Sequence, residues 1–257
     1  DIVLKTLPCR IEQLERVADD VMILRFKLPA NERLQYRAGQ YIEFLLKDGK
    51  RRSFSMANAP HDDALIELHI RHLPGGLFTD RVFGVSTPAL KVRDILRFEG
   101  AHGGFYLRDD SDKPIILLAS GTGFAPIKAI VEHMIHTGNV RPVVLYWGGR
   151  RPSDLYLDEL ACGWAAQHPQ WFRYVPVVSD ALPEDAWDGR TGFVHRAVMQ
   201  DLPDLSGYQV YACGAPVVVD SARVDFTTQC NLPEADFFAD SFVVAAQADA
   251  VATAASK

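Results

Sequence analysis

The sequence has few cysteines and no closely spaced cysteine pair. Its 257 residues include only Cys9, Cys162, Cys213 and Cys230, which lie far apart. Without a C-x-x-C pattern, these residues predict neither a zinc site nor an iron–sulfur cluster. Scattered thiols in a chain of this length are typical of a reducing compartment, and we therefore expect a cytoplasmic protein.

Long apolar runs and polybasic stretches are also missing. No run of about 18 apolar residues and no signal peptide occurs, so no membrane segment is expected. The net charge is −6 and the densest basic clusters, 50–52 and 150–151, are short. A nucleic-acid backbone is therefore not an expected partner. Because the sequence begins at Asp1 without methionine, we expect a piece of a longer polypeptide.

The central stretch, residues 114–130, contains neither G-x-G-x-x-G nor the G-K-[ST] end of a P-loop. Its apolar run 115–119 predicts a buried parallel strand, and Ser120-Gly-Thr-Gly123 predicts a tight turn. Pro126 and the apolar residues after it predict a helix. A strand, glycine turn and helix in this order point backbone N–H groups at an anion, usually a phosphate. A merely structural turn is the alternative.

The pattern of the sequence changes near residue 110. Residues 1–110 hold short alternating segments, the last at 92–99 and closed by Gly100, which predict an antiparallel six-stranded Greek-key β-barrel. Residues 111–244 alternate apolar strands with helices and predict a doubly wound α/β domain with a parallel sheet. Residues 245–257 form an Ala-rich tail, which we expect to be flexible.

Four short motifs follow one another across the two predicted domains. They are Arg52-x-Phe54-Ser55, Gly76-x-x-Thr79, Gly121-Thr-Gly-Phe-Ala-Pro126 and Cys213-Gly214. In this order and spacing the chain resembles the ferredoxin–NADP reductase superfamily from about Cys9 to Phe242. It is especially similar to oxygenase reductases and to reductases of the CDP-6-deoxy-glucoseen type. The resemblance implies an FAD-binding barrel followed by an NAD-binding α/β domain.

The resemblance implies a role for each motif residue of the barrel. Arg52 is expected to bind the FAD pyrophosphate, and Phe54 to stack on the isoalloxazine ring, where many members carry Tyr. Ser55 is expected at the N5 edge of the flavin and is one of two candidate catalytic residues. The remaining residues implied to contact FAD are His69, Ile70 and Arg71 near the ribityl chain and diphosphate, and Gly75, Gly76 and Thr79 at the pyrophosphate.

For the second domain, the resemblance implies that Gly121, Thr122 and Gly123 face the nicotinamide nucleotide. Cys213, followed by Gly214, is the other candidate catalytic residue, beside C4 of the nicotinamide. It comes after the predicted strand 208–212, at the carboxyl end where open α/β sheets bind ligands. Its implied role is to position the ring for hydride transfer. A buried structural thiol is the alternative.

The choice of coenzyme is predicted from charge. In the family, the segment after the third strand of the α/β domain meets the adenosine ribose, and here it contains Asp180. A carboxylate repels a 2′-phosphate and accepts hydrogen bonds from ribose hydroxyls. We therefore predict NADH over NADPH, although Arg150 and Arg151 argue for the opposite preference.

Two further sets of residues are candidates, one for a flavin contact and one for metal binding. Phe242, or Phe238, is a candidate for the terminal aromatic that covers the flavin in the family, and a hydrophobic final strand is the alternative. His133 and His136 lie one helical turn apart but lack an evident third ligand. No metal is therefore expected.

The function implied is that of an NADH-dependent flavoprotein reductase. Hydride passes from NADH to FAD, and single electrons then pass to a [2Fe–2S] centre on a missing domain or a separate protein, with a terminal oxygenase or dehydratase downstream. One alternative is a stand-alone reductase of free flavin. Another is a non-catalytic flavin-binding electron-transfer subunit or redox sensor.

Overall fold

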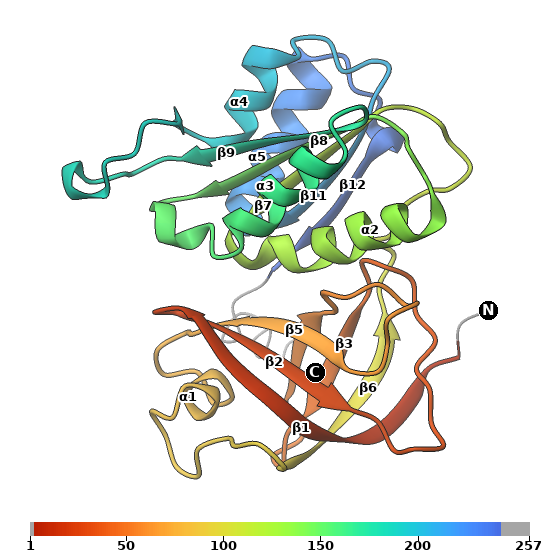
Figure 1. Cartoon of the computed structure of the whole chain (residues 1–257), viewed down its shortest axis with the longest axis vertical. Helices are drawn as coiled ribbons and strands as arrows, with labels where there is room; N and C mark the ends of the chain where they lie inside the picture. Colours follow the sequence, from red (N-terminus) through yellow and green to blue (C-terminus); the bar gives the residue numbers. More distant parts are fainter. Residues whose placement is uncertain (1–2, 243–257) are drawn as a thin grey trace, which may run out of the picture. The chain divides into compact units, whose positions relative to one another are not determined.

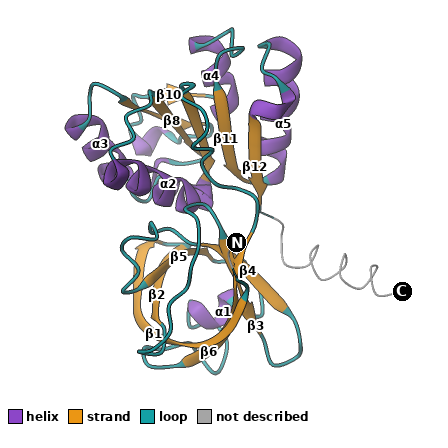
Figure 2. Ribbon diagram, turned by 90° about the vertical axis from the view of Figure 1, so that its right-hand side faces the viewer, coloured by secondary structure: helices purple, strands orange, loops and turns teal. Residues whose placement is uncertain are grey.

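The computed structural model describes residues 3–242, which form two compact units (Figures 1 and 2). The first unit comprises residues 3–107 together with 128–136, and the second comprises 108–127 and 137–242. The expected barrel and α/β architecture is confirmed. The boundaries at residues 110 and 244 stay predictions, and the expected tail at 245–257 lies outside the described residues.

The first unit is built on a six-stranded sheet of order β4-β3-β6-β1-β2-β5, in which every pair is antiparallel. A bridge between Met56 and Leu68 joins the two edges and closes the barrel. The strands are β1 (Lys5–Ala18), β2 (Val21–Lys27), β3 (Tyr41–Leu45), β4 (Arg51–Ser55), β5 (Ile66–Arg71) and β6 (Ile95–His102), and a short helix, α1 (Thr79–Val82), lies between the last two.

The interior of the barrel is aromatic. Phe26 packs against Phe44 and Phe98, with ring centroids 6.0 and 5.2 Å away, and all three rings are fully buried. Alternate residues of each strand face this core because side chains of a strand point to opposite sides. The apolar parity of β5 that the sequence predicts is found there, with Ile66, Leu68 and Ile70 in the core.

Strand β6 runs further than the sequence predicts. The expected strand 92–99 ended at Gly100, whereas β6 continues to His102. Gly100 itself pairs with Lys5 of β1. A Cβ at Gly100 would lie 2.8 Å from Cγ2 of Ile42, so glycine here permits close packing and does not end the strand.

The second unit contains a six-stranded sheet of order β10-β9-β8-β7-β11-β12, with all neighbours parallel. Its strands are β7 (Ile115–Ser120), β8 (Val143–Gly149), β9 (Phe172–Val178), β10 (Arg190–Thr191), β11 (Gln209–Gly214) and β12 (Phe237–Ser241). Its helices are α2 (Phe124–Thr137, whose residues 128–136 belong to the first unit), α3 (Asp158–Gln167), α4 (Val194–Asp201) and α5 (Pro216–Gln229). Short 3₁₀ turns occupy Gly121–Gly123, Pro152–Asp154, Pro183–Asp185 and Glu234–Asp236.

Helices α4 and α5 cover one face of this sheet (Figure 2), where Val198 and Phe226 join the buried side chains of β7 and β11. The other face carries an aromatic stack. The ring of Trp147 lies 3.9 Å from that of Phe124, which in turn lies 5.7 Å from Trp164 of α3. Both faces are therefore apolar, as expected of a parallel sheet.

Two sequence predictions for the second unit are wrong in detail. The strand expected at 208–212 continues to Gly214, so Cys213 lies inside β11. The sequence pattern also predicts a helix over 154–166. The helix instead begins at Asp158, because the Asp154 carboxylate accepts the N–H groups of Arg150 and Arg151 and closes a separate turn. The stretch 237–241 is strand β12, which agrees with the alternative of a hydrophobic final strand.

Within residues 3–242, no helix is both long and apolar enough to span a membrane.

The buried aromatic core predicts a large effect of truncation. Phe44→Ala should lower the free energy of unfolding by about 3–5 kcal/mol, because it leaves a cavity beside Phe26 and Phe78. Urea denaturation of the apoprotein measures this. The control Val85→Ala, at a side chain 65% exposed, should change it by no more than about 0.5 kcal/mol. An equal effect of the two changes would contradict the packing described.

Candidate functional site

The glycine turn of the second unit is held against the end of β11. Gly121 has φ +55°, in the left-handed region where glycine is favoured. A Cβ on Gly123 would overlap the carbonyl oxygen of Cys213, so only glycine allows this approach. The indole N–H of Trp147 donates to the carbonyl of Gly121 at 3.0 Å. The turn is thereby fixed from two sides, and helix α2 follows it directly.

Cys213 lies at the carboxyl end of β11, paired with Ala119 of β7. Its side chain is fully buried, and burial, with a smaller contribution from the charge of Asp240, raises the pKa of its thiol well above the usual value. The sulfur is therefore a neutral thiol at physiological pH, unlike a nucleophilic cysteine. The next residue, Gly214, has φ +134° and accepts the N–H of Phe242 at 2.7 Å.

The structure thus brings together the residues predicted for the nicotinamide end of the second unit. It also separates the two aromatic candidates. Phe238 lies within β12, stacked 4.8 Å from Tyr211 and covered by the guanidinium of Arg108 at 4.7 Å. Phe242 follows the strand and is half-buried. Of the two, Phe242 is the ring that is not packed within the sheet.

Asp180 follows β9, where a ribose contact was predicted. Its N–H donates to the carbonyl of Arg150 at 2.8 Å, and its carboxylate accepts Nε of Arg150 at 3.3 Å. Both side chains are exposed. Arg151 instead makes a two-bond pair with Asp185, each bond 2.7 Å long. Of the two arginines that argued for NADPH, one is thus held by Asp185 and the other lies against Asp180.

In the first unit, β4 carries the predicted flavin motif. Arg52 is buried and donates to the carbonyl of Arg51 at 2.8 Å. The half-buried ring of Phe54 lies 5.6 Å from Phe78. Ser55, the last residue of the strand, is buried. Phe54 and Arg52 lie on the same face of β4 because they are two residues apart.

The turn before α1 is closed by the hydroxyl of Thr79. This hydroxyl donates to the carbonyl of Leu73 and accepts its N–H, both at 3.1 Å. A Cβ at Gly76 would lie 2.7 Å from this hydroxyl oxygen, which explains the glycine. At Gly75, with φ +86°, a Cβ would have no neighbour within 4 Å. There is therefore space beside Gly75, although its N–H donates to the carboxylate of Asp80 at 3.3 Å, and a pyrophosphate contact here stays a prediction.

The three predicted residues of β5 have different surroundings. Ile70 is fully buried in the barrel core, and His69 is buried on the opposite side of the strand. Arg71 is exposed, with Nε 3.3 Å from a carboxylate oxygen of Asp20. The contacts of these residues with FAD stay predictions.

A buried charged cluster that the sequence analysis missed surrounds His69. Glu67 accepts Nε of Arg25 at 2.9 Å and Nε2 of His69 at 2.8 Å, and Nζ of Lys128 lies 3.0 Å from it. Burial would raise the pKa of Glu67, but the bond from His69 and the charge of Lys128 outweigh burial and hold the pKa well below its usual value. Burial lowers the pKa of His69. The only sequence signal was the i, i+4 pair of Lys128 and Glu132.

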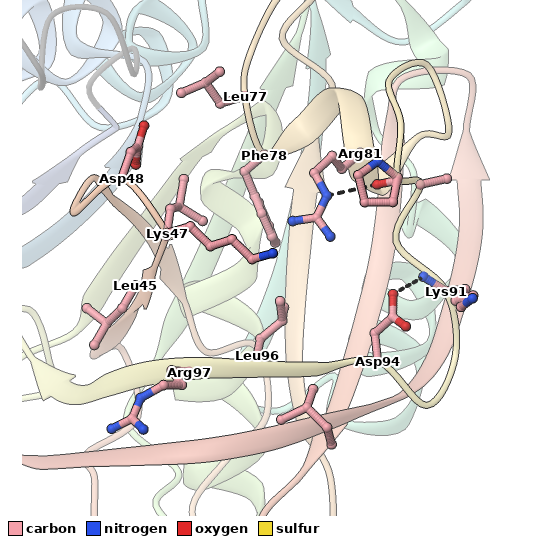
Figure 3. A pocket seen from close by; sticks show the side chains of 14 residues that line it. Leu45, Lys47, Asp48, Leu77, Phe78, Arg81, Lys91, Asp94, Leu96 and Arg97 are labelled. Atoms are coloured by element: carbon pink, nitrogen blue, oxygen red, sulfur yellow. Dashed lines mark hydrogen bonds between the residues drawn. The ribbon is translucent and has the colours of Figure 1, made fainter.

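A pocket of about 660 Å³ opens on the first unit, between the β3–β4 hairpin, α1 and the start of β6 (Figure 3). Phe78 points into it, and Lys47, Arg81, Lys91 and Arg97 lie around it. None of the residues predicted to bind FAD lines this pocket. It adjoins the predicted pyrophosphate turn only through Leu77 and Phe78.

Among the described residues, one group has the spacing of metal ligands: Glu43, Glu99 and His102. The guanidinium of Arg51 lies 3.0 Å from Glu99 and 3.8 Å from Glu43, so a cation of the chain itself already lies between the carboxylates. His136, one of the two histidines weighed as ligands, stacks on His61 with centroids 3.7 Å apart.

A closed antiparallel barrel and a doubly wound parallel sheet, each with a glycine turn suited to a phosphate, define a two-domain oxidoreductase that binds a flavin and a nicotinamide nucleotide. Family comparison agrees. The model described as the oxidoreductase FAD-binding domain matches residues 8–106, and that described as the oxidoreductase NAD-binding domain matches residues 117–223.

Individual relatives extend this match. The CDP-6-deoxy-L-threo-D-glycero-4-hexulose-3-dehydrase reductase of Yersinia pseudotuberculosis is 45% identical over 93% of this chain and 69% of its own length. The NAD(P)H-flavin reductase of Aliivibrio fischeri is 30% identical over 91% of this chain and 97% of its own length. The crystal structure of an Amycolatopsis cytochrome P450 reductase superposes with a TM-score of 0.85 at 31% identity, covering 95% of this chain and 72% of that one. The chain belongs to the ferredoxin–NADP reductase-like family of FAD- and NAD-binding oxidoreductases.

The buried His69 predicts a dependence of stability on pH. Because burial lowers its pKa below about 6.5, the unfolded chain binds a proton that the folded chain refuses as the pH falls through that value. Stability should therefore fall between pH 7 and pH 5. His69→Gln, whose amide still donates to Glu67, should flatten this fall in urea denaturation of the apoprotein. His168→Gln in the second unit should not, and an unchanged slope in His69→Gln would refute the assignment.

Proposed function

We propose that this chain is an NADH-dependent flavoprotein reductase that delivers electrons to an iron–sulfur centre on a partner protein or on a further domain. The observation that carries the proposal is the backbone approach of Gly123 to Cys213, which places a glycine turn and a neutral thiol at one edge of the parallel sheet. Ligands of such sheets bind at this edge.

Bound FAD supplies the chemistry, since it accepts a hydride and releases electrons singly. The residues of the first unit hold and orient it. Arg52 and the turn at Gly75 would bind the pyrophosphate, because a guanidinium pairs with phosphate oxygens and the turn leaves space beside Gly75. The ring face of Phe54 lies on the flavin, and the Ser55 hydroxyl donates to its N5 edge.

The residues of the second unit orient the nicotinamide. The N–H groups at the Gly121–Gly123 turn and the start of α2 bind the phosphates of the coenzyme. Cys213 is a neutral, buried thiol, so it contributes bulk and a weak donor beside C4 of the ring and no negative charge. Its role is to hold the ring in the orientation for hydride transfer. Phe242, which follows β12, would be the terminal aromatic residue that this family uses at the flavin.

The coenzyme is NADH because Asp180 is exposed at the predicted ribose position and lies against Arg150. A 2′-phosphate would have to displace the carboxylate from the guanidinium. An exposed ion pair is weak, so the repulsion of the phosphate by Asp180 matters more than the loss of that pair.

The names of two relatives support a partner protein as the electron acceptor. The Yersinia relative is a dehydrase reductase and the Amycolatopsis relative a cytochrome P450 reductase, so both names pair a reductase with a second enzyme. A [2Fe–2S] acceptor, a downstream oxygenase or dehydratase, and a cytoplasmic location complete the proposal. Free-flavin reduction is the second candidate, favoured by the Aliivibrio relative, whose own length this chain covers to 97%.

The central experiment is reconstitution. The purified chain should bind FAD, turn yellow and oxidise NADH with ferricyanide or a [2Fe–2S] ferredoxin as acceptor. Gly121→Ala should lower this rate at least tenfold, because a Cβ is strained at φ +55° and shifts the turn. A colourless protein that reduces added flavin would support the second candidate. Bound flavin without NADH oxidation, or full activity in Gly121→Ala, would contradict the proposal.

The coenzyme preference is tested separately. Wild type should have a lower KM for NADH than for NADPH, and Asp180→Ser should lower the KM for NADPH about tenfold, equivalent to about 1.4 kcal/mol. Steady-state kinetics with both coenzymes measure this, with the exposed Asp188→Ser as a matched control. A wild-type preference for NADPH would refute the role given to Asp180.

A further inference from the structure

Two charged side chains on α2, both in the part of the helix that belongs to the first unit, contact the backbone just after β4. Nζ of Lys128 donates to the carbonyl of Ala57 at 3.2 Å. A carboxylate oxygen of Glu132 accepts the N–H of Ala59 at 3.1 Å. The two side chains also pair with each other at 2.7 Å.

The ammonium group of Lys128 has all its hydrogen-bonding capacity in use. Its three donors face the Ala57 carbonyl, Glu132 and Glu67, the last at 3.0 Å. Only 11% of the side chain is exposed. Glu132 is bound through both oxygens, one to Lys128 and the other to Ala59. The pair is therefore a directional connection between a buried ammonium group and a half-buried carboxylate, and not a loose surface ion pair.

The backbone of residues 56–59, which these side chains contact, makes further hydrogen bonds. The N–H of Met56 donates to the carbonyl of Gln40 at 3.0 Å, and that of Ala57 donates to the carbonyl of Glu67 at 2.8 Å. The N–H of Ala59 is bound by Glu132 alone among the contacts that the structure records for it. Loss of the Glu132 acceptor would thus release the N–H of Ala59, while the neighbouring Asn58 keeps the bond of its carbonyl to Tyr36 and the bonds of its side chain to the backbone at residues 62, 65 and 67.

The burial of Lys128 between Glu67 and Glu132 is poorly explained by stability alone, since well-packed apolar residues of similar size often stabilise as much. What charged groups add is direction, because each donor and acceptor specifies a position for its partner. Here the specified positions are the Ala57 carbonyl and the Ala59 N–H, two and four residues after Ser55.

We propose that Glu132, together with Lys128, is a positioning residue for flavin reduction, which fixes the 57–59 backbone and through it the place of Ser55. This inference rests on the proposed function, in which Ser55 lies at the N5 edge of the flavin. Hydride transfer is sensitive to displacements of about 1 Å in the groups that align the reacting atoms. Neither residue touches the reacting atoms themselves.

The test compares two substitutions at one position. Glu132→Met keeps the bulk of the side chain but offers no strong acceptor, whereas Glu132→Gln keeps an oxygen for the Ala59 N–H. Glu132→Ala replaces the methionine variant if methionine does not fold. Glu159→Ala, at an exposed glutamate of α3, is the control for loss of a helical charge.

Two readouts are needed, and one does not depend on the loaded enzyme. In the apoprotein, the amide of Ala59 should exchange with solvent at least tenfold faster in Glu132→Met than in wild type. In the reconstituted protein, stopped-flow reduction of the flavin by saturating NADH should be about tenfold slower, with the half-saturating NADH concentration unchanged within about twofold. Glu132→Gln and Glu159→Ala should stay within about threefold of wild type in both.

Wild-type reduction rates in a methionine variant with faster amide exchange would overturn the inference, because the backbone would then be free without effect on the reaction. An equal fall in the flavin reduction rate in the glutamine and methionine variants would also overturn it. Because glutamine keeps the acceptor for the Ala59 N–H, the fall would then come from the lost charge and not from the lost hydrogen bond. A wild-type chain that bound no FAD or oxidised no NADH would instead overturn the proposed function, and the amide-exchange result would still be read separately.

Discussion

The approach of the Gly123 backbone to the carbonyl of Cys213 is the constraint on which the second unit depends. Any side chain at residue 123 would push apart the turn after β7 and the end of β11, two strands that lie side by side in the sheet. Because the strands are parallel, their carboxyl ends meet at one edge, and the turn places the start of helix α2 there. Cys213 is itself fully buried at this edge, and burial keeps its thiol neutral.

The first unit depends on an apolar barrel interior together with buried charged groups on the outer side of β5. Its barrel is closed around aromatic rings, yet the outer side of β5 carries Glu67 and His69, buried beneath Lys128. Carboxylate, imidazole and ammonium satisfy one another there, which is the condition under which such groups can be buried. The barrel therefore holds its predicted flavin strand, β4, between an apolar interior on one side and a polar, directional set of contacts at its end.

Local sequence patterns predicted the architecture and most of the motif positions. The run 115–119 lies entirely within strand β7, because a continuous apolar segment of that length has few other conformations in an α/β chain. Local patterns gave the wrong strand end at Gly100, because this glycine allows close packing within β6 and does not form a turn. They also failed where a side chain closed a turn, as Asp154 does. Neither role can be predicted from the residue alone, because each depends on the groups that it contacts in the folded chain.

The order of elements, the two glycine turns and the identity of the motif residues were determined by the sequence alone, because they depend on neighbours within a few positions. Tertiary structure decided which of the candidates are accessible and which are packed. It covered Phe238 with Tyr211 and Arg108, buried Ile70 in the barrel, and set Asp180 against Arg150. It also paired Lys128 with Glu67, which lies 61 positions earlier in the chain. Such contacts between distant residues arise only when strands and helices pack, so no local pattern encodes them.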